Sequence, residues 1–163
     1  MKDAFGGILN IVFVAVFLVV VSGILGFIVS YTKAFKMKDS VISTIENFEG
    51  SGCYPSTSSG SGNIVTGTAC ANEVLNSAKR LAYSPSSLKK CPTGFYAISG
   101  DGGILACVMM DKKTKSIGKR DNVSVATFTV ITQVDIDFPI VDKIMGMRVF
   151  QVSGDTRTVE LQS

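Results

Sequence analysis

An uncharged apolar run near the N-terminus constrains this chain more than any other feature. Residues 8–31 contain no Asp, Glu, Lys or Arg, and only Lys2 and Asp3 carry charge before them. A helix of this length rises about 36 Å, enough to cross a hydrocarbon core about 30 Å thick. The run has no polar face for a water-soluble helix to present. We therefore predict a short tail at residues 1–7 and a transmembrane helix at residues 8–31.

A cleavable signal peptide is the alternative interpretation of this run. The apolar region of a signal peptide usually has about 7 to 15 residues and ends at an A-x-A-like site. This run is longer, and no clear site of that kind follows it. The sequence favours a retained anchor.

The helical pattern continues past the apolar run as an amphipathic segment at residues 32–50. Gly50 is placed to end the helix, and no proline precedes it. We predict one helix from about Ala4 to Glu49, about 69 Å long, with a second half that packs on the following domain. A break at Asp39 and Ser40, which could cap a separate helix, is the alternative. The apolar positions that recur at helical spacing are Val41, Ile42, Ile45 and Phe48.

Residues 51–163 are predicted to form a single head domain that begins with a Gly/Ser/Thr-rich loop. A short helix follows, ended by Ser84 and Pro85, and Cys70 lies at its start. Its predicted apolar face consists of Val74, Leu75, Ala78, Leu81 and Ala82.

From Cys91 onward the hydrophobic period changes to two, which indicates strands. Segments 94–100 and 104–112 flank Asp101, Gly102 and Gly103, a hairpin signature. Segments 146–153 and 156–162 predict a final hairpin around Gly154 and Asp155. We therefore expect an α+β, pilin-like fold with about four antiparallel strands, whose apolar face is covered by the end of the long helix.

The strand at residues 124–139 has the clearest alternation, which predicts one buried face and one solvated face. The predicted buried face consists of Phe128, Val130, Thr132, Val134, Ile136 and Phe138. The predicted solvated face consists of Thr127, Thr129, Gln133, Asp135 and Asp137.

The charge distribution argues against nucleic acid as a partner. The net charge is only +3 and is dispersed along the chain. One basic cluster lies in a Gly-containing, turn-like stretch without interleaved aromatic residues, so we predict a solvated loop; a phosphate-binding patch is the alternative. This cluster consists of Lys112, Lys113, Lys115, Lys119 and Arg120.

Four cysteines lie in the head, namely Cys53, Cys70, Cys91 and Cys107. They form no CxxC pair and the chain has no histidine, which disfavours a zinc site. Two disulfides and an extracytoplasmic, oxidising location fit better, whereas four buried thiols in a cytoplasmic domain are the alternative. Four cysteines allow three pairings. Proximity in sequence favours Cys53 with Cys70 and Cys91 with Cys107.

The basic residues beside the apolar run point to the opposite orientation. Lys33, Lys36 and Lys38 follow the run and only Lys2 precedes it, which by the positive-inside rule places the head in the cytoplasm. The cysteines and the Gly/Ser/Thr-rich loops outweigh this count. We predict a single-pass protein of the cell membrane with its C-terminal domain outside the cytoplasm.

A stripe of small residues at Ser22, Gly26 and Ser30 repeats every fourth position of the predicted span. Small side chains let another helix backbone approach closely in lipid. We predict a helix-association stripe here, although Gly and Ser are also frequent in spans that do not associate. No GxSxG or HExxH motif occurs, so we expect no enzyme, no catalytic residue, no metal and no cofactor.

A membrane helix that continues into a head, with its amphipathic half laid against a cysteine-stapled antiparallel sheet, resembles the type IV pilin superfamily. The chain is most similar to the small pilin-like, or pseudopilin, subunits of Tad-type pilus and secretion systems. Prepilins carry a glycine at the peptidase site and a glutamate as the fifth residue after it. Here Gly6 and Gly7 are followed at that distance by Ile11 and Val12.

The resemblance implies a structural subunit of a surface filament or secretion apparatus. Its expected partners are the lipid bilayer and other single-span subunits or copies of itself, with no small-molecule substrate. The alternative is a single-pass anchored binding or adhesion domain outside the cytoplasm that forms no filament.

Overall fold

A computed structural model describes residues 2–54, 64–84, 90–100, 103–117, 121–135 and 149–160. It contains two helices and a six-stranded sheet, so the α+β prediction is confirmed. The helices are α1 (Lys2–Asn47) and α2 (Ala69–Leu81). The strands are β1 (Ile64–Val65), β2 (Tyr96–Gly100), β3 (Gly103–Ile117), β4 (Asp121–Asp135), β5 (Val149–Asp155) and β6 (Val159–Glu160).

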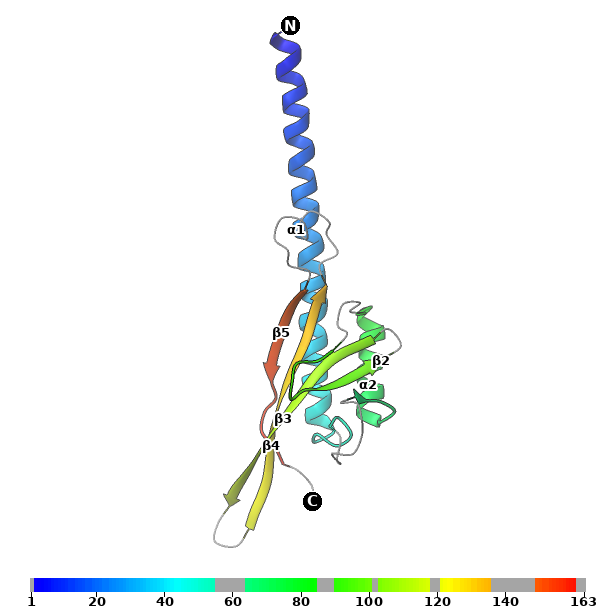
Figure 1. The fold of residues 1–163 in the computed structure, drawn as a ribbon, viewed down its shortest axis with the longest axis vertical. Coiled ribbons are helices and arrows are strands. Elements are labelled where there is room, and N and C mark those ends of the chain that lie inside the picture. Colours follow the sequence, from blue (N-terminus) through cyan, green and yellow to red (C-terminus); the bar gives the residue numbers. More distant parts are fainter. Residues whose placement is uncertain are drawn as a thin grey trace.

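Helix α1 runs for 46 residues without a break at Asp39 or Ser40, as the continuous-helix prediction requires. Its N-terminal half projects alone from the head, and its C-terminal half lies along the sheet (Figure 1). The C-terminal half is the spine of the head, because Ala34, Met37, Val41 and Ile45 are all fully buried there.

Both helices end with the same pair of backbone hydrogen bonds, donated by the residues just after the helix to carbonyl groups near its C-terminus. After α1, the Gly50 N–H donates to the Ile45 carbonyl at 2.9 Å and the Glu49 N–H donates to the Glu46 carbonyl at 3.2 Å. This is a Schellman arrangement, with Glu49 at φ 50° and Gly50 at φ 74°. The end predicted from Gly50 is therefore correct, although Glu49 takes the first left-handed position. Ala82 (φ 47°) does the same after α2, and Ala82 is consequently exposed rather than part of the apolar face.

The sheet is mixed and larger than the predicted four antiparallel strands. Strands β2, β3, β4 and β5 pair antiparallel in that order, whereas β1 pairs parallel with β2. Strand β1 has only two residues and follows a Gly/Ser-rich stretch, so it carries no periodic signal. Its parallel pairing with β2 is therefore a feature of the tertiary structure that no local sequence pattern predicts.

The predicted final hairpin is wrong. Strands β5 and β6 do not pair with each other; both pair with β4, β5 over Thr129 to Asp135 and β6 over Val125 and Ala126. The Thr156 N–H donates to the Phe128 carbonyl at 2.8 Å between the two pairings, so the chain continues along one edge of β4. Gly154 therefore lies within a strand. A Cβ there would meet Lys38 Cδ at 3.0 Å and Ile42 Cδ1 at 3.2 Å, so glycine lets β5 approach α1 closely.

The β3–β4 pairing extends from Cys107 with Ile131 to Ile117 with Asp121. Lys112, Lys113 and Lys115 thus belong to a strand, and the prediction of a loop at these positions is wrong. The long hairpin extends beyond the head on the side away from the N-terminus (Figure 1). Lys119 and Arg120 lie outside the described residues, as do Asp101 and Gly102 in the first hairpin. Their flanking residues, Gly100 and Gly103, pair as predicted.

The core lies between the sheet, α1 and α2. Phe128, Val130, Thr132 and Val134 on β4 are all buried, as predicted, and so are Val74 and Ala78 on α2. The opposite face of β4 is less exposed to solvent than predicted: Thr127 and Thr129 are half-buried, and Gln133 is only 5% exposed. The positions predicted for 136–138 lie outside the described residues, as does the side chain of Asp135.

Candidate functional site

The free half of α1 is the main candidate for a functional surface. Its large apolar side chains point outward on every side, with exposures from 71% at Ile11 to 37% at Phe27. Among the described residues, α1 is the one helix long and apolar enough to cross a membrane, by length and composition. A signal sequence near an N-terminus meets the same criteria.

The predicted stripe of small residues is only partly open. Ser22 is exposed, and its Oγ donates to the Leu18 carbonyl at 2.7 Å, within its own helix. A Cβ added at Gly26 would meet nothing within 4 Å. Ser30 is half-buried, because positions four apart drift by roughly 40° around a helix and this row leads to buried Ala34. Ser22 and Gly26 therefore remain available to a second helix, and Ser30 lies at the edge of the head.

Polar contacts fix the spine of α1 to the head along its length. The buried Thr132 Oγ1 of β4 donates to the Ala34 carbonyl at 3.0 Å. Near the far end of α1, the Arg157 N–H donates to Glu46 Oε1 at 2.9 Å. These contacts act with the buried apolar face to hold the C-terminal half of α1 against the head.

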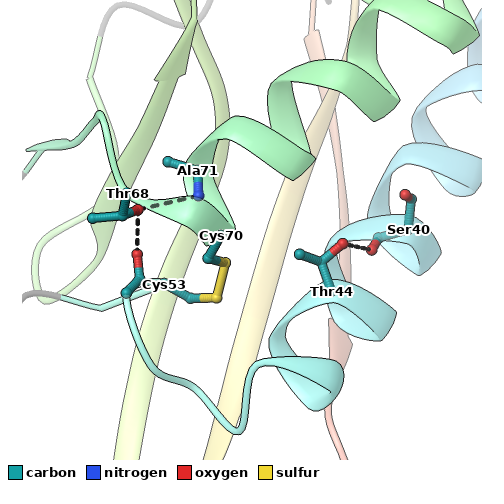
Figure 2. The surroundings of a disulfide bond; sticks show 7 residues. Ser40, Thr44, Cys53, Thr68, Cys70 and Ala71 are labelled. Carbon is teal, nitrogen blue, oxygen red and sulfur yellow. Dashed lines mark hydrogen bonds between the residues drawn. A yellow bond between two sulfur atoms is a disulfide. The ribbon is translucent and has the colours of Figure 1, made fainter.

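Two disulfides join segments around α2 and β2. Cys53 pairs with Cys70 and Cys91 with Cys107, which is the pairing that proximity in sequence favours. Figure 2 shows the first bond, which ties the turn after α1 to the first turn of α2. Thr68 lies beside it. Its Oγ1 accepts from the Ala71 N–H at 3.1 Å as the N-cap of α2 and donates to the Gly52 carbonyl.

An aromatic cluster lies next to this disulfide. The Tyr54 and Tyr96 ring centres are 4.5 Å apart, edge to face, and the Phe128 ring centre is 6.5 Å from that of Tyr54. Burial, followed by a hydrogen bond with Tyr96, raises the pKa of Tyr54 to about 12. The phenol is therefore a stable hydrogen-bonding group near neutral pH and not a proton donor or nucleophile.

Four aromatic residues that sequence reasoning did not single out lie where α1 enters the head. Phe27, Tyr31 and Phe35 lie one turn apart on α1, with ring centres 6.1 and 6.4 Å apart along the series; we call them the aromatic ladder. The ring of Phe150, in β5, meets Phe27 at 5.9 Å. The spacing of four could have revealed the ladder, but only the tertiary structure brings Phe150 to it.

Among the described residues, no group of three or more His, Cys, Asp or Glu side chains could hold a metal ion. Comparison of the chain with models of protein families, with curated proteins and with solved structures gives no match.

Proposed function

We propose that this protein is a membrane-anchored, pilin-like structural subunit, of the pseudopilin type, that assembles through its N-terminal helix into a surface filament or secretion apparatus. The observation that carries the proposal is the continuity of α1. Its first half offers apolar side chains on every side, and its second half is the buried spine of the head. Such a rod serves equally as an anchor in lipid and as the packing element of an assembly.

The proposal places the head outside the cytoplasm. Two disulfides in a head of this size fit an oxidising compartment, where they persist. The lysines after the apolar run favour the opposite orientation by count, but Lys33 and Lys38 both engage groups of the protein. Lys33 Nζ donates to the Ala82 carbonyl at 3.5 Å, and Lys38 Nζ lies 3.1 Å from Asp39 Oδ1.

Orientation is tested on intact cells with a membrane-impermeant thiol reagent, applied before and after reduction. We expect no labelling before reduction, because all four cysteines are paired, and labelling afterwards. Labelling that needs both reduction and permeabilised cells places the head in the cytoplasm and contradicts the proposal.

Assembly is tested by oxidative crosslinking of the full-length chain in its membrane. Ser22→Cys and Gly26→Cys each add one free thiol on the open part of the stripe, since the native cysteines are paired. We expect both variants to form crosslinked species with copies of the chain or with other single-span subunits. Val20→Cys is the matched control, because it is exposed on the same helix, roughly 120° from Gly26.

An amine-reactive crosslinker on the same membranes separates a filament subunit from an anchored binding domain. A filament subunit gives a series of crosslinked oligomers of increasing size, which is lost when residues 2–31 are deleted. A chain that stays in the membrane fraction but gives neither thiol crosslinks nor such oligomers is the anchored binding or adhesion domain instead.

A further inference from the structure

We propose that the head rests on the bilayer, with Phe150 of β5 and the first two rings of the aromatic ladder, Phe27 and Tyr31, seated in the interfacial layer of phospholipid headgroups and upper acyl chains. The inference depends on the membrane-anchoring part of the proposed function. It adds a second contact with lipid, made by the head itself, and thereby sets the depth and tilt of the whole subunit.

The length of the span leads to this conclusion. Residues 8–27 form a helix about 30 Å long, which equals the thickness of the hydrocarbon core. The charge-free stretch runs further, from Ala4 to Thr32, about 44 Å, which is close to the thickness of a bilayer with its headgroups. Phe27 therefore lies near the boundary of the hydrocarbon, and Lys33 lies at the outer limit of the headgroups.

The head begins before the charge-free stretch ends. The Phe150 ring lies 5.9 Å from the Phe27 ring, six residues or about 9 Å of helix below Lys33. Because Phe150 and Phe27 share one depth, a bilayer that covers residues 8–27 brings the start of β5 into the interface.

The side chains at this level are those that interfaces favour. Phe27, Tyr31 and Phe35 are 37%, 43% and 41% exposed, so each presents a ring face outward. Tyrosine concentrates at the level of the headgroups, where its ring and its hydroxyl are both accommodated, and phenylalanine inserts at the boundary between headgroups and acyl chains. At the upper end of the ladder, Lys38 Nζ lies 3.9 Å from the centre of the Phe35 ring.

The experiment uses tryptophan fluorescence of the full-length chain reconstituted in phosphatidylcholine vesicles. The chain has no tryptophan, so each variant carries one indole. Phe150→Trp reports the start of β5, and Gln151→Trp, at an exposed neighbouring site, gives a second reading if the first variant disturbs the Phe27 contact. Phe17→Trp reports the middle of the span, and Ser43→Trp reports an exposed site on α1 about 24 Å beyond Phe27.

Lipids brominated near the carbonyl end of the acyl chain are expected to quench Phe150→Trp and Gln151→Trp strongly. Lipids brominated near the methyl end should quench Phe17→Trp instead, and neither lipid should quench Ser43→Trp. Quenching of Phe17→Trp with none at positions 150 and 151 overturns the inference and leaves the anchor intact. Failure to quench Phe17→Trp overturns the anchor itself. Blue-shifted emission of Phe150→Trp without quenching by either lipid would mean that this site is covered by another protein chain and not by lipid. That result also contradicts the inference.

Discussion

Gly50 is the residue on which the junction between helix and head depends most directly. It adopts φ 74°, and a Cβ there would lie 2.5 Å from Phe128 Cζ. Phe128 is fully buried in the core and cannot move away without opening that core. Gly50 therefore satisfies both the left-handed turn after α1 and the close packing of the turn on β4.

We predict that Gly50→Ala destabilises the head by about 1 kcal/mol from backbone strain and by a further 1–3 kcal/mol, roughly, from overpacking. Thermal unfolding followed by circular dichroism, with the disulfides intact, measures the loss. Gly67→Ala is the matched control, since Gly67 has the same φ of 74° but nothing within 4 Å of the added Cβ. Equal losses in the two variants would show that the Phe128 contact adds nothing.

Tyr54 is predicted to titrate well above an ordinary tyrosine. Burial and the hydrogen bond with Tyr96 raise its pKa to about 12 from 10.0. Because the folded pKa is above the unfolded one, the stability from this group is complete below pH 10 and is lost as pH rises toward about 12.

Ultraviolet difference titration of tyrosinate measures this directly, and Tyr54→Phe identifies the transition. Tyr96→Phe should lower the pKa of Tyr54 only in part, because burial is the larger cause of the shift. A return to the ordinary value in Tyr96→Phe would mean that the hydrogen bond dominates.

At the scale of elements, the two disulfides stabilise one side of the head selectively. Each closes a loop with a sequence separation of 17 or 16 residues, and in the chain-entropy model such a loop contributes about 3 kcal/mol. The long β4–β5 pairing contains no cysteine. The segment from Cys53 to Cys107 thus depends on covalent closure, and β4 with β5 depends on packing against α1.

We predict that reduction increases amide exchange in α2 and β2 before it affects β4 and β5. Hydrogen exchange with mass spectrometry, on the full-length chain before and after reduction, checks the order. The double variant Cys53→Ser with Cys70→Ser should affect α2 first, whereas Cys91→Ser with Cys107→Ser should affect β2 first. Uniform loss of protection would instead indicate one cooperative unit.

Elements differ in how far their own sequence specifies them. Helix α1 follows from a long apolar run that continues into an amphipathic segment, and the β2–β3 hairpin follows from a two-residue connection with glycine on both sides. The prediction of a turn at Gly154 is wrong because glycine occurs both in turns and in strands that must approach a helix closely. The prediction of a loop at the lysines of β3 is wrong because pairing with β4 supplies the hydrogen bonds that make this polar stretch a strand.

At the scale of the whole molecule, we predict that a substitution in the open part of the stripe changes assembly in the membrane without changing the stability of the head. Gly26→Leu should reduce crosslinking between copies or partner subunits in the membrane, because the added side chain keeps the second backbone away. It should leave the unfolding of the head unchanged, since nothing in the fold lies within 4 Å of the new Cβ.

Crosslinking yield in membranes and thermal unfolding in detergent measure the two effects separately. Val20→Leu, at an exposed site on another side of the same helix, is the control for added bulk in lipid. An unchanged yield in Gly26→Leu would exclude the stripe as the contact.

The sequence by itself determined the properties that depend on local periodicity and residue chemistry. These are the long helix, its change from apolar to amphipathic, the alternation of β4 and the proximity of each cysteine to its partner. The tertiary structure alone decided the contacts between segments far apart in the chain. Strand β1 joins β2 in parallel, β5 and β6 share one edge of β4, and Phe150 reaches Phe27 across more than a hundred residues. Such pairings depend on which surfaces remain to be buried once the helix and sheet have met, and no local pattern encodes that.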